Sequence, residues 1–158
     1  MPLRTARADM ALIAELLTTA ENEARALGDP EPAAEHVLLA ALFVGDASAR
    51  EALGAEPSAV RDAIAAVHNA ALDTRGITGD AAPAPLPPSP GVYRSEVSAR
   101  EVFQHARRLA RRSPSGLRSA HVLLAVAERE HGTAARMLRH LGFERDAVVD
   151  AARTQSAS

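Results

Sequence analysis

The sequence contains no cysteine, no lysine and no tryptophan, and only one tyrosine and three phenylalanines among its 158 residues. Without cysteine the chain cannot form a disulfide framework, use a thiol nucleophile or bind a metal through sulfur. Without lysine it cannot contain the phosphate-binding loop G-x-x-x-x-G-K-[ST] or form a Schiff base on a lysine amine. These absences exclude ATP hydrolysis through that loop and covalent catalysis through a thiol or a lysine.

Long apolar runs are also missing. No segment approaches the roughly 20 consecutive apolar residues that a membrane-spanning helix needs. Asp9 and Glu15 interrupt the apolar residues that follow the N-terminal arginines, so a signal-peptide core does not form. We therefore expect a cytoplasmic protein with no membrane partner.

Sequence patterns for catalysis and metal binding are not found either. The chain has neither a G-x-S-x-G nucleophile motif nor an H-E-x-x-H zinc motif. His131 and His140 are nine residues apart, which is outside the usual spacing of paired metal ligands. The sequence predicts no catalytic residue, no metal and no cofactor, and we do not expect an enzyme.

Alanine, leucine and valine dominate the apolar residues, which make up 47% of the chain. Alanine and leucine are strong helix formers, and the β-branched and aromatic runs typical of strands are absent, so we predict an all-α fold. The net charge of −2 is unevenly divided. Residues 1–80 carry 6 arginines and 13 acids, and residues 81–158 carry 12 arginines and 7 acids. This asymmetry indicates either a nucleic-acid-binding face or two lobes that attract one another.

The segment HVLLA occurs twice, at residues 36–40 and 121–125. In each half a helix with an apolar stripe precedes it, a short helix ending in Leu-Gly follows it, and another helix closes the set. The first helix is predicted over residues 9–27, starting at Asp9. One four-helix unit of this size buries a marginal core. We therefore predict about eight helices in two four-helix repeats that pack together around a pseudo-twofold axis.

A proline- and glycine-rich segment separates the two halves. Five of the ten prolines fall between residues 82 and 90, a composition typical of an extended connector. We divide the chain into a first repeat (1–73), a connector (74–95), a second repeat (96–154) and a tail (155–158).

The order of motifs in both halves resembles the Clp N-terminal (Clp R) repeat. In the first half the matching residues are Ala20, Glu23, Ala24, Leu27, Gly28, Glu35, His36, Val37, Leu38, Leu39, Ala40, Leu42, Leu53 and Gly54. In the second half they are Ala106, Ala110, Ser119, His121, Val122, Leu123, Leu124, Ala125, Leu141 and Gly142. The resemblance covers nearly the whole chain apart from the connector and the tail.

In the family that the chain resembles, the double repeat is a helical cap on a ring-shaped ATP-driven unfoldase. The cap receives adaptors and client proteins for degradation, and in some relatives it binds phosphorylated arginine or antimicrobial cyclic peptides. The resemblance therefore implies a docking module without the motor. Its partners would be clients, adaptors, phosphoarginine-marked proteins or cyclic peptides, and its role that of a helper of the unfoldase or of a sponge for toxic peptides.

The resemblance also implies a ligand groove near the start of the second helix of each repeat. The candidate residues are Glu35, His36, Leu3, Ser119, His121 and Tyr93. The acid of the motif is present as Glu35 and replaced by Ala120 in the second copy. Glu35 is interpreted either as a first-turn acid favoured by the helix dipole or as the partner of a cationic ligand group, and the two histidines as packing residues. Since Ala34 cannot cap a helix, we predict that this helix starts earlier, near Glu31 and Pro32.

A cluster of arginines lies on one face of the first predicted helix of the second repeat, and Arg118 could join it from the next turn. Its members are Arg107, Arg108, Arg111, Arg112 and Arg118. They form either a solvated face that balances the acidic half or a binding site for a phosphate, a nucleic acid or an acidic adaptor. The few aromatic residues available for stacking on bases and the absence of a nucleic-acid-reading motif count against DNA or RNA binding. An arginine-rich nucleic-acid-binding regulator is therefore kept only as the alternative function.

Overall fold

The computed structural model is all-helical, and it describes residues 3–74 and 98–158. This part of the chain forms eight helices and no strand, which confirms the predicted all-α class. The helices are α1 (Leu3–Ala26), α2 (Ala34–Ala41), α3 (Ser48–Leu53), α4 (Pro57–Thr74), α5 (Ala99–Ala110), α6 (Ser119–Ala127), α7 (Thr133–His140) and α8 (Arg145–Ala157). None of these helices is both long enough and apolar enough to span a bilayer.

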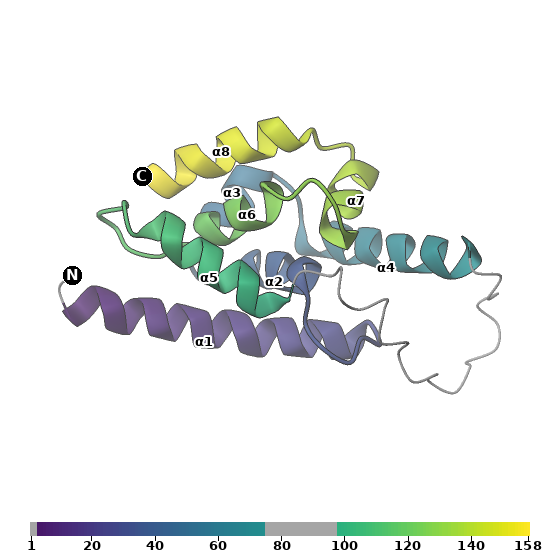
Figure 1. The fold of residues 1–158 in the computed structure, drawn as a ribbon, viewed down its shortest axis with the longest axis horizontal. Coiled ribbons are helices and arrows are strands. Elements are labelled where there is room, and N and C mark those ends of the chain that lie inside the picture. Colours follow the sequence, from purple (N-terminus) through teal and green to yellow (C-terminus); the bar gives the residue numbers. More distant parts are fainter. Residues whose placement is uncertain (1–2, 75–97) are drawn as a thin grey trace.

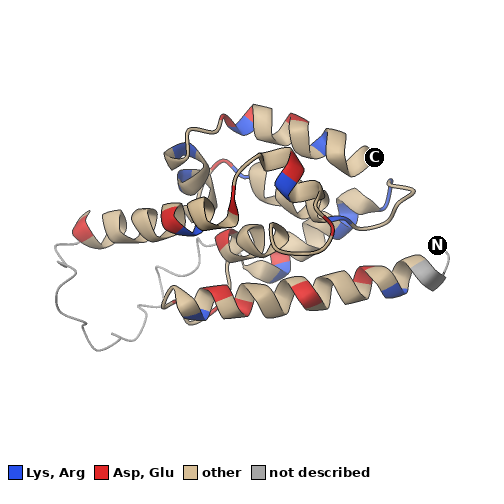
Figure 2. Cartoon of the chain, turned by 180° about the vertical axis from the view of Figure 1, so that it is seen from behind, with Lys and Arg blue, Asp and Glu red and all other residues tan. Residues whose placement is uncertain are grey.

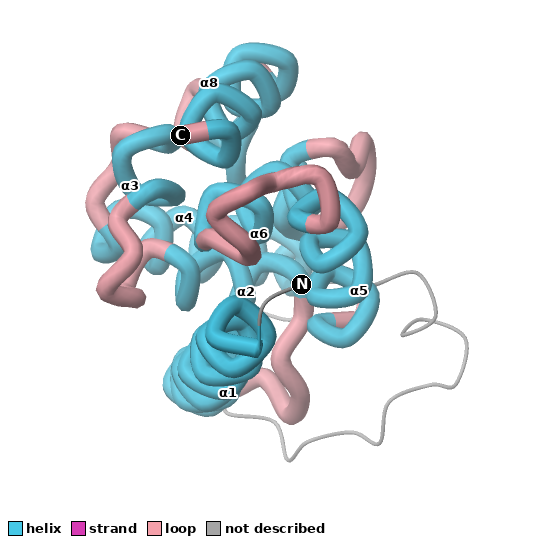
Figure 3. The backbone as a smooth tube through the Cα atoms, turned by 90° about the vertical axis from the view of Figure 1, so that its left-hand side faces the viewer, coloured by secondary structure: helices cyan, strands magenta, loops and turns pink. Residues whose placement is uncertain are grey.

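The two short helices α2 and α6 occupy the middle of the molecule. Both carry the HVLLA segment and are mostly apolar, which is typical of a buried helix, and every residue of both helices is buried. They pack against each other, and α1, α3, α5 and α8 lie around them (Figures 1 and 3). The repeated motif therefore forms the centre of the core.

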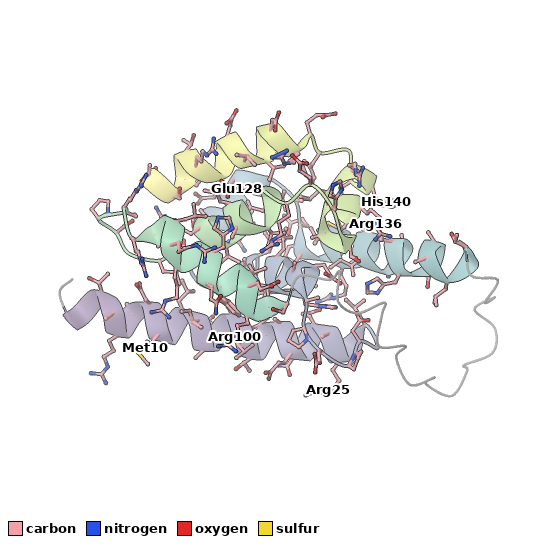
Figure 4. All side chains as sticks on the ribbon, viewed as in Figure 1. Met10, Arg25, Arg100, Glu128, Arg136 and His140 are labelled. Atoms are coloured by element: carbon pink, nitrogen blue, oxygen red, sulfur yellow. The ribbon has the colours of Figure 1, made fainter. Side chains whose placement is uncertain are left out.

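The longest helix, α1, runs along one side of the molecule (Figure 1). Its inner stripe of Leu16, Ala20 and Ala24 is buried against the core, as the sequence pattern predicts. The helix begins at Leu3 instead of the predicted residue 9. Met10, which is 72% exposed, projects away from the other helices (Figure 4).

The pairs of helices in contact follow a regular scheme. Helix α1 packs on α2 as α5 packs on α6, and α3 packs on α8 as α4 packs on α7. If each of α1 to α4 is exchanged for its counterpart among α5 to α8, each of these pairings becomes another pairing of the same set. The scheme is what two interlocked repeats would produce, and the pseudo-twofold relation itself stays a prediction.

The predicted early start of the second helix is wrong. Helix α2 begins at Ala34, and Ala33 is the extended residue before it. The cap comes from inside the helix, because the backbone N–H of Ala33 donates to Nδ1 of His36 at 2.9 Å. This bond is one half of a capping box. At the start of α6 the N–H of Arg118 donates to Nδ1 of His121 at 3.0 Å in the same way.

Helix α1 carries four acidic residues and three arginines, and basic residues are frequent in the second half of the chain (Figure 2). Some of this opposite charge is paired between helices: Arg61 of α4 contacts Glu23 of α1 through two bonds of 2.8 and 2.9 Å. Both residues belong to the acidic half of the chain, so this ion pair stabilises contacts within that half.

Candidate functional site

The first copy of the motif carries a cluster of two histidines and two carboxylates. His36 and His68 lie with their ring centroids 6.4 Å apart. Nε2 of His36 is 2.8 Å from Oδ2 of Asp29, and Nδ1 of His68 is 3.6 Å from the same oxygen. Glu35 completes the cluster, because its Oε1 lies 3.6 Å from Nε2 of His68. The cluster connects the turn after α1 with the start of α2 and with α4.

The protonation of the His36 ring follows from its two contacts. Nδ1 accepts the N–H of Ala33, so the proton of the neutral ring must sit on Nε2, from which it is donated to Asp29. The residue is 1% exposed and both ring nitrogens are satisfied. His36 therefore caps the start of α2 and packs in the core, and its role as a ligand residue stays a prediction.

Glu35 is buried, with only 4% of its side chain exposed. It lines a small pocket of about 10 Å³ together with Arg129, His131 and the first residues of α7, Thr133 and Ala134. This volume accommodates about one water molecule. The acid kept by the first copy thus lies where the start of α2 meets the start of α7, in a pocket that Arg129 also lines.

The start of α6 in the second copy is built differently. The hydroxyl of Ser119 donates to the carbonyl of Asp46 at 2.7 Å and accepts the N–H of Ala49 at 3.0 Å. The hydroxyl of Ser48 in turn accepts the N–H of Ala120 at 2.9 Å. Each helix therefore caps the other, since Ser48 belongs to α3 and Ser119 to α6.

The direction of the bond between the two serine hydroxyls, 3.0 Å apart, can be assigned. Ser119 has used its single proton on the carbonyl of Asp46, so Ser48 must be the donor and Ser119 the acceptor. Both residues are at most 1% exposed. The seam between α3 and α6, defined by Asp46, Ser48 and Ser119, is closed and fully hydrogen-bonded.

Asp46 completes this seam from the edge. Its carboxylate accepts the N–H of Ser119 at 2.6 Å and the N–H of Ser48 at 3.0 Å. Burial alone would raise the pKa of Asp46, but these hydrogen bonds and the nearby Arg118 guanidinium outweigh burial and hold the pKa below its ordinary value. Asp46 is thus an anchored anion that caps both helices.

His121, the counterpart of His36, is 2% exposed. Burial lowers the pKa of its ring below the ordinary value, and the Arg118 guanidinium adds to this lowering. The unfolded chain consequently binds a proton at this histidine more readily than the folded chain does. The neutral ring stabilises the fold above the ordinary histidine pKa of about 6.5, and this contribution is lost as the pH falls through the lower pKa of the folded state.

We expect His121→Gln to flatten the loss of stability on acidification. Glutamine at this position can still accept the N–H of Arg118, as in a capping box, but it does not titrate. The free energy of unfolding of the natural protein should fall between pH 7.5 and 5 with an additional slope of at most about 1.4 kcal/mol per pH unit. Urea denaturation at several pH values measures it, and His140→Gln on the exposed end of α7 is the control. Equal slopes for the natural protein and His121→Gln would show that the titration of His121 does not cause the loss of stability.

The predicted arginine cluster separates into two parts. Arg107, Arg108, Arg111 and Arg112 are exposed around the C-terminal end of α5, and no ion pair involves them within the described part of the chain. Arg118 is only 26% exposed, and it donates from Nη1 to the carbonyl of Gln155 at 2.9 Å. The first four arginines form one surface, whereas Arg118 ties the start of α6 to α8.

The side chains of two further candidates lie outside the described part of the structure. Leu3 is the first residue of α1, but its side chain is not described, and Tyr93 falls between residues 75 and 97. Of the remaining candidates, Glu35 and His36 lie together at the start of α2, and Ser119 and His121 lie together at the start of α6.

Sequence reasoning missed Asp29, His68 and Arg129. His68 follows the buried Val60 and Ile64 of α4 at helical spacing, so the pattern did carry a signal for it. Asp29 and Arg129 lie in turns, and only the packing of distant segments brings them to the cluster and to the Glu35 pocket. Within residues 3–74 and 98–158, no group of histidine and acidic side chains has an arrangement that could hold a metal ion.

No protein-family model matches this sequence, and no curated protein matches it. The resemblance to the Clp N-terminal repeat therefore rests on the motifs themselves.

Proposed function

We propose that this chain is a non-enzymatic docking module of the Clp N-domain type. It would capture client segments, adaptors or peptide-type small molecules for the Clp unfoldase, or in competition with it. One observation supports this best: the acid kept in only one copy, Glu35, lines a pocket beside Arg129 and the start of α7.

One side of the pocket favours a positively charged ligand group, and the other side favours a negatively charged one. The Glu35 carboxylate can accept hydrogen bonds from a guanidinium-type group. The N-terminus of α7 and the guanidinium of Arg129 favour an anion. Phosphoarginine carries a phosphoryl group on a guanidinium, so its two ends match the two sides of this pocket. The second copy, with Ala120 and a closed seam, offers no such pair.

The size of the pocket limits how a ligand enters. Room for about one water means that a larger group binds only when a lining side chain moves. Among the residues that line the pocket, His131 is the exposed one. Movement of the His131 side chain would leave the core unchanged, because this side chain is exposed and is not part of the core around α2 and α6.

We expect phosphoarginine, or an antimicrobial cyclic peptide, to bind the protein and Glu35→Gln to weaken that binding at least about tenfold. The substitution removes the negative charge and keeps the shape, and a charge-assisted hydrogen bond contributes about 1.5–3 kcal/mol. Isothermal titration calorimetry measures the effect. Glu31→Gln, an exposed acid four residues earlier, is the matched control.

Binding that is equal in the natural protein and Glu35→Gln would contradict the Glu35 site. No heat with either ligand would contradict the small-ligand version of the proposal. Mass spectrometry of material captured on the immobilised protein separates the remaining versions. Unfoldase subunits or clients support a helper, and cyclic peptides support a sponge. Strongly salt-dependent retention on DNA would instead favour the regulator that uses the four exposed arginines around the C-terminal end of α5.

A further inference from the structure

A second cavity, larger than the Glu35 pocket, lies between the end of α6, helix α7 and the start of α8. Its volume is about 290 Å³, close to the lower end of the roughly 300–1,000 Å³ typical of small-molecule sites. Three arginines line it, Arg129, Arg139 and Arg145, and its apolar wall includes Leu138 and Phe143. None of these residues was singled out by the sequence motifs.

The charges of this cavity are only partly neutralised. Arg145 lies 3.4 Å from Oε1 of Glu130, which also lines the cavity, and it donates from Nε to the carbonyl of Ala127 at 3.3 Å. Three arginines against one glutamate leave a net charge of +2 on the lining. The cavity therefore favours an anion.

Arg129 provides an independent observation. Its Nε is buried and has no hydrogen-bond partner within the part of the chain that the structure describes. A buried donor without a partner is rare in folded proteins and unfavourable. Arg139, by contrast, uses its Nε on the carbonyl of Ala135 at 3.4 Å. Arg129 lines the cavity, so its guanidinium brings to this site a donor capacity that the described part of the protein leaves unused.

We propose that this cavity binds an organic carboxylate with an apolar body. The carboxylate would accept hydrogen bonds from Arg129, whose guanidinium suits bidentate contact, and the apolar body would pack on Leu138 and Phe143. Such a group occurs at the C-terminus of a polypeptide that ends in a large apolar residue, and also in a free aromatic or aliphatic acid. The site is separate in chemistry from the Glu35 pocket, although Arg129 lines both.

N-acetylphenylalanine and its primary amide are suitable probes, because they differ only in the charge of the carboxyl group. Calorimetry with the whole chain should show binding of the acid and binding at least about tenfold weaker for the amide. Arg129→Met should weaken binding of the acid by a similar factor. Arg136→Met is the matched control, since Arg136 is exposed on α7 and does not line the cavity (Figure 4).

Thermal unfolding separates this role from a structural one. Arg129→Met removes a buried donor that has no partner, so the midpoint of unfolding should stay unchanged or rise while binding is lost. Equal binding of acid and amide, unchanged binding by Arg129→Met, or no binding of the acid at millimolar concentration would each overturn the proposal. Displacement by inorganic phosphate at equal concentration would also overturn it, because the apolar wall would then contribute nothing.

A short peptide ending in phenylalanine distinguishes the two sources of the ligand. Tighter binding than that of N-acetylphenylalanine assigns the site to polypeptide C-termini, and weaker binding assigns it to free acids. Both results support a carboxylate site, provided that the amidated peptide does not bind.

Discussion

Replacement of Ser119 by alanine is expected to lower the free energy of unfolding by about 2–4 kcal/mol. The hydroxyl of Ser119 holds three partners in a seam that is nearly inaccessible to water: the carbonyl of Asp46, the N–H of Ala49 and the hydroxyl of Ser48. The substitution leaves all three without that partner, and each buried unsatisfied group costs about 1–3 kcal/mol before the structure relaxes.

Urea denaturation followed by circular dichroism measures this loss. Ser58→Ala, at an exposed position of α4, should change stability by no more than about 0.5 kcal/mol. The double variant Ser48→Ala with Ser119→Ala should lose less than the sum of the single variants, because both remove the same bond between hydroxyls. A loss at Ser119 as small as that at Ser58 would show that the seam does not stabilise the fold. Ser119 would then be available for the ligand role that the resemblance implies.

Gly116→Ala is expected to cost about 2–4 kcal/mol, because two effects add at this position. Gly116 has φ of +77°, a conformation unfavourable by about 1–2 kcal/mol for residues with a side chain. A Cβ atom there would lie 2.5 Å from Cγ2 of Thr5 and 2.9 Å from Oδ1 of Asp9, so α1 would have to move. That movement would disturb the bond between Oδ1 of Asp9 and the N–H of Leu117, which is 2.9 Å long.

Gly142→Ala is a matched control for this prediction. Gly142 has φ of +81°, and nothing lies within 4 Å of an added Cβ, so only the backbone strain of about 1–2 kcal/mol should appear. Urea denaturation measures the loss in the free energy of unfolding for both variants. The difference between the two losses is the cost of the contact between α1 and the Cβ added at residue 116. Equal losses at Gly116 and Gly142 would contradict the close contact.

The same contact explains why the start of α1 was predicted too late. Asp9 precedes an apolar periodic run and is typical of a helix N-cap. Its carboxylate instead accepts the N–H of Leu117 from the far end of the sequence, and the helix continues back to Leu3. A sequence pattern shows that an aspartate can cap, but not which backbone group it caps.

The helical class could be predicted because composition and periodicity determine it locally. The start of α2 could not, because the ring of His36, which the sequence analysis assigned to packing, accepts the N–H of Ala33 just before the helix. Ser119 was predicted as a ligand residue, and the structure shows its hydroxyl capping α3, 70 residues away in sequence. Such reciprocal capping depends on which helix starts meet, and that is decided by tertiary packing.

The candidate site, too, could be predicted only in part from the sequence. Glu35 could be singled out because it is present in one copy of the motif and absent from the other. Its neighbours Arg129 and His131 come from the turn before α7, and no local pattern connects them to α2. The sequence alone therefore indicates one member of the pocket, whereas the fold supplies the group of opposite charge.

Amide chemical shifts during titration with phosphoarginine test the central claim, that the start of α2 is a ligand site and the start of α6 is not. We expect shifts to concentrate at Glu35, His131 and Thr133, with the signals of Ser119 and Ala120 unchanged. Shifts confined to the exposed arginines near the end of α5, or equal shifts at both helix starts, would contradict the assignment of the Glu35 pocket.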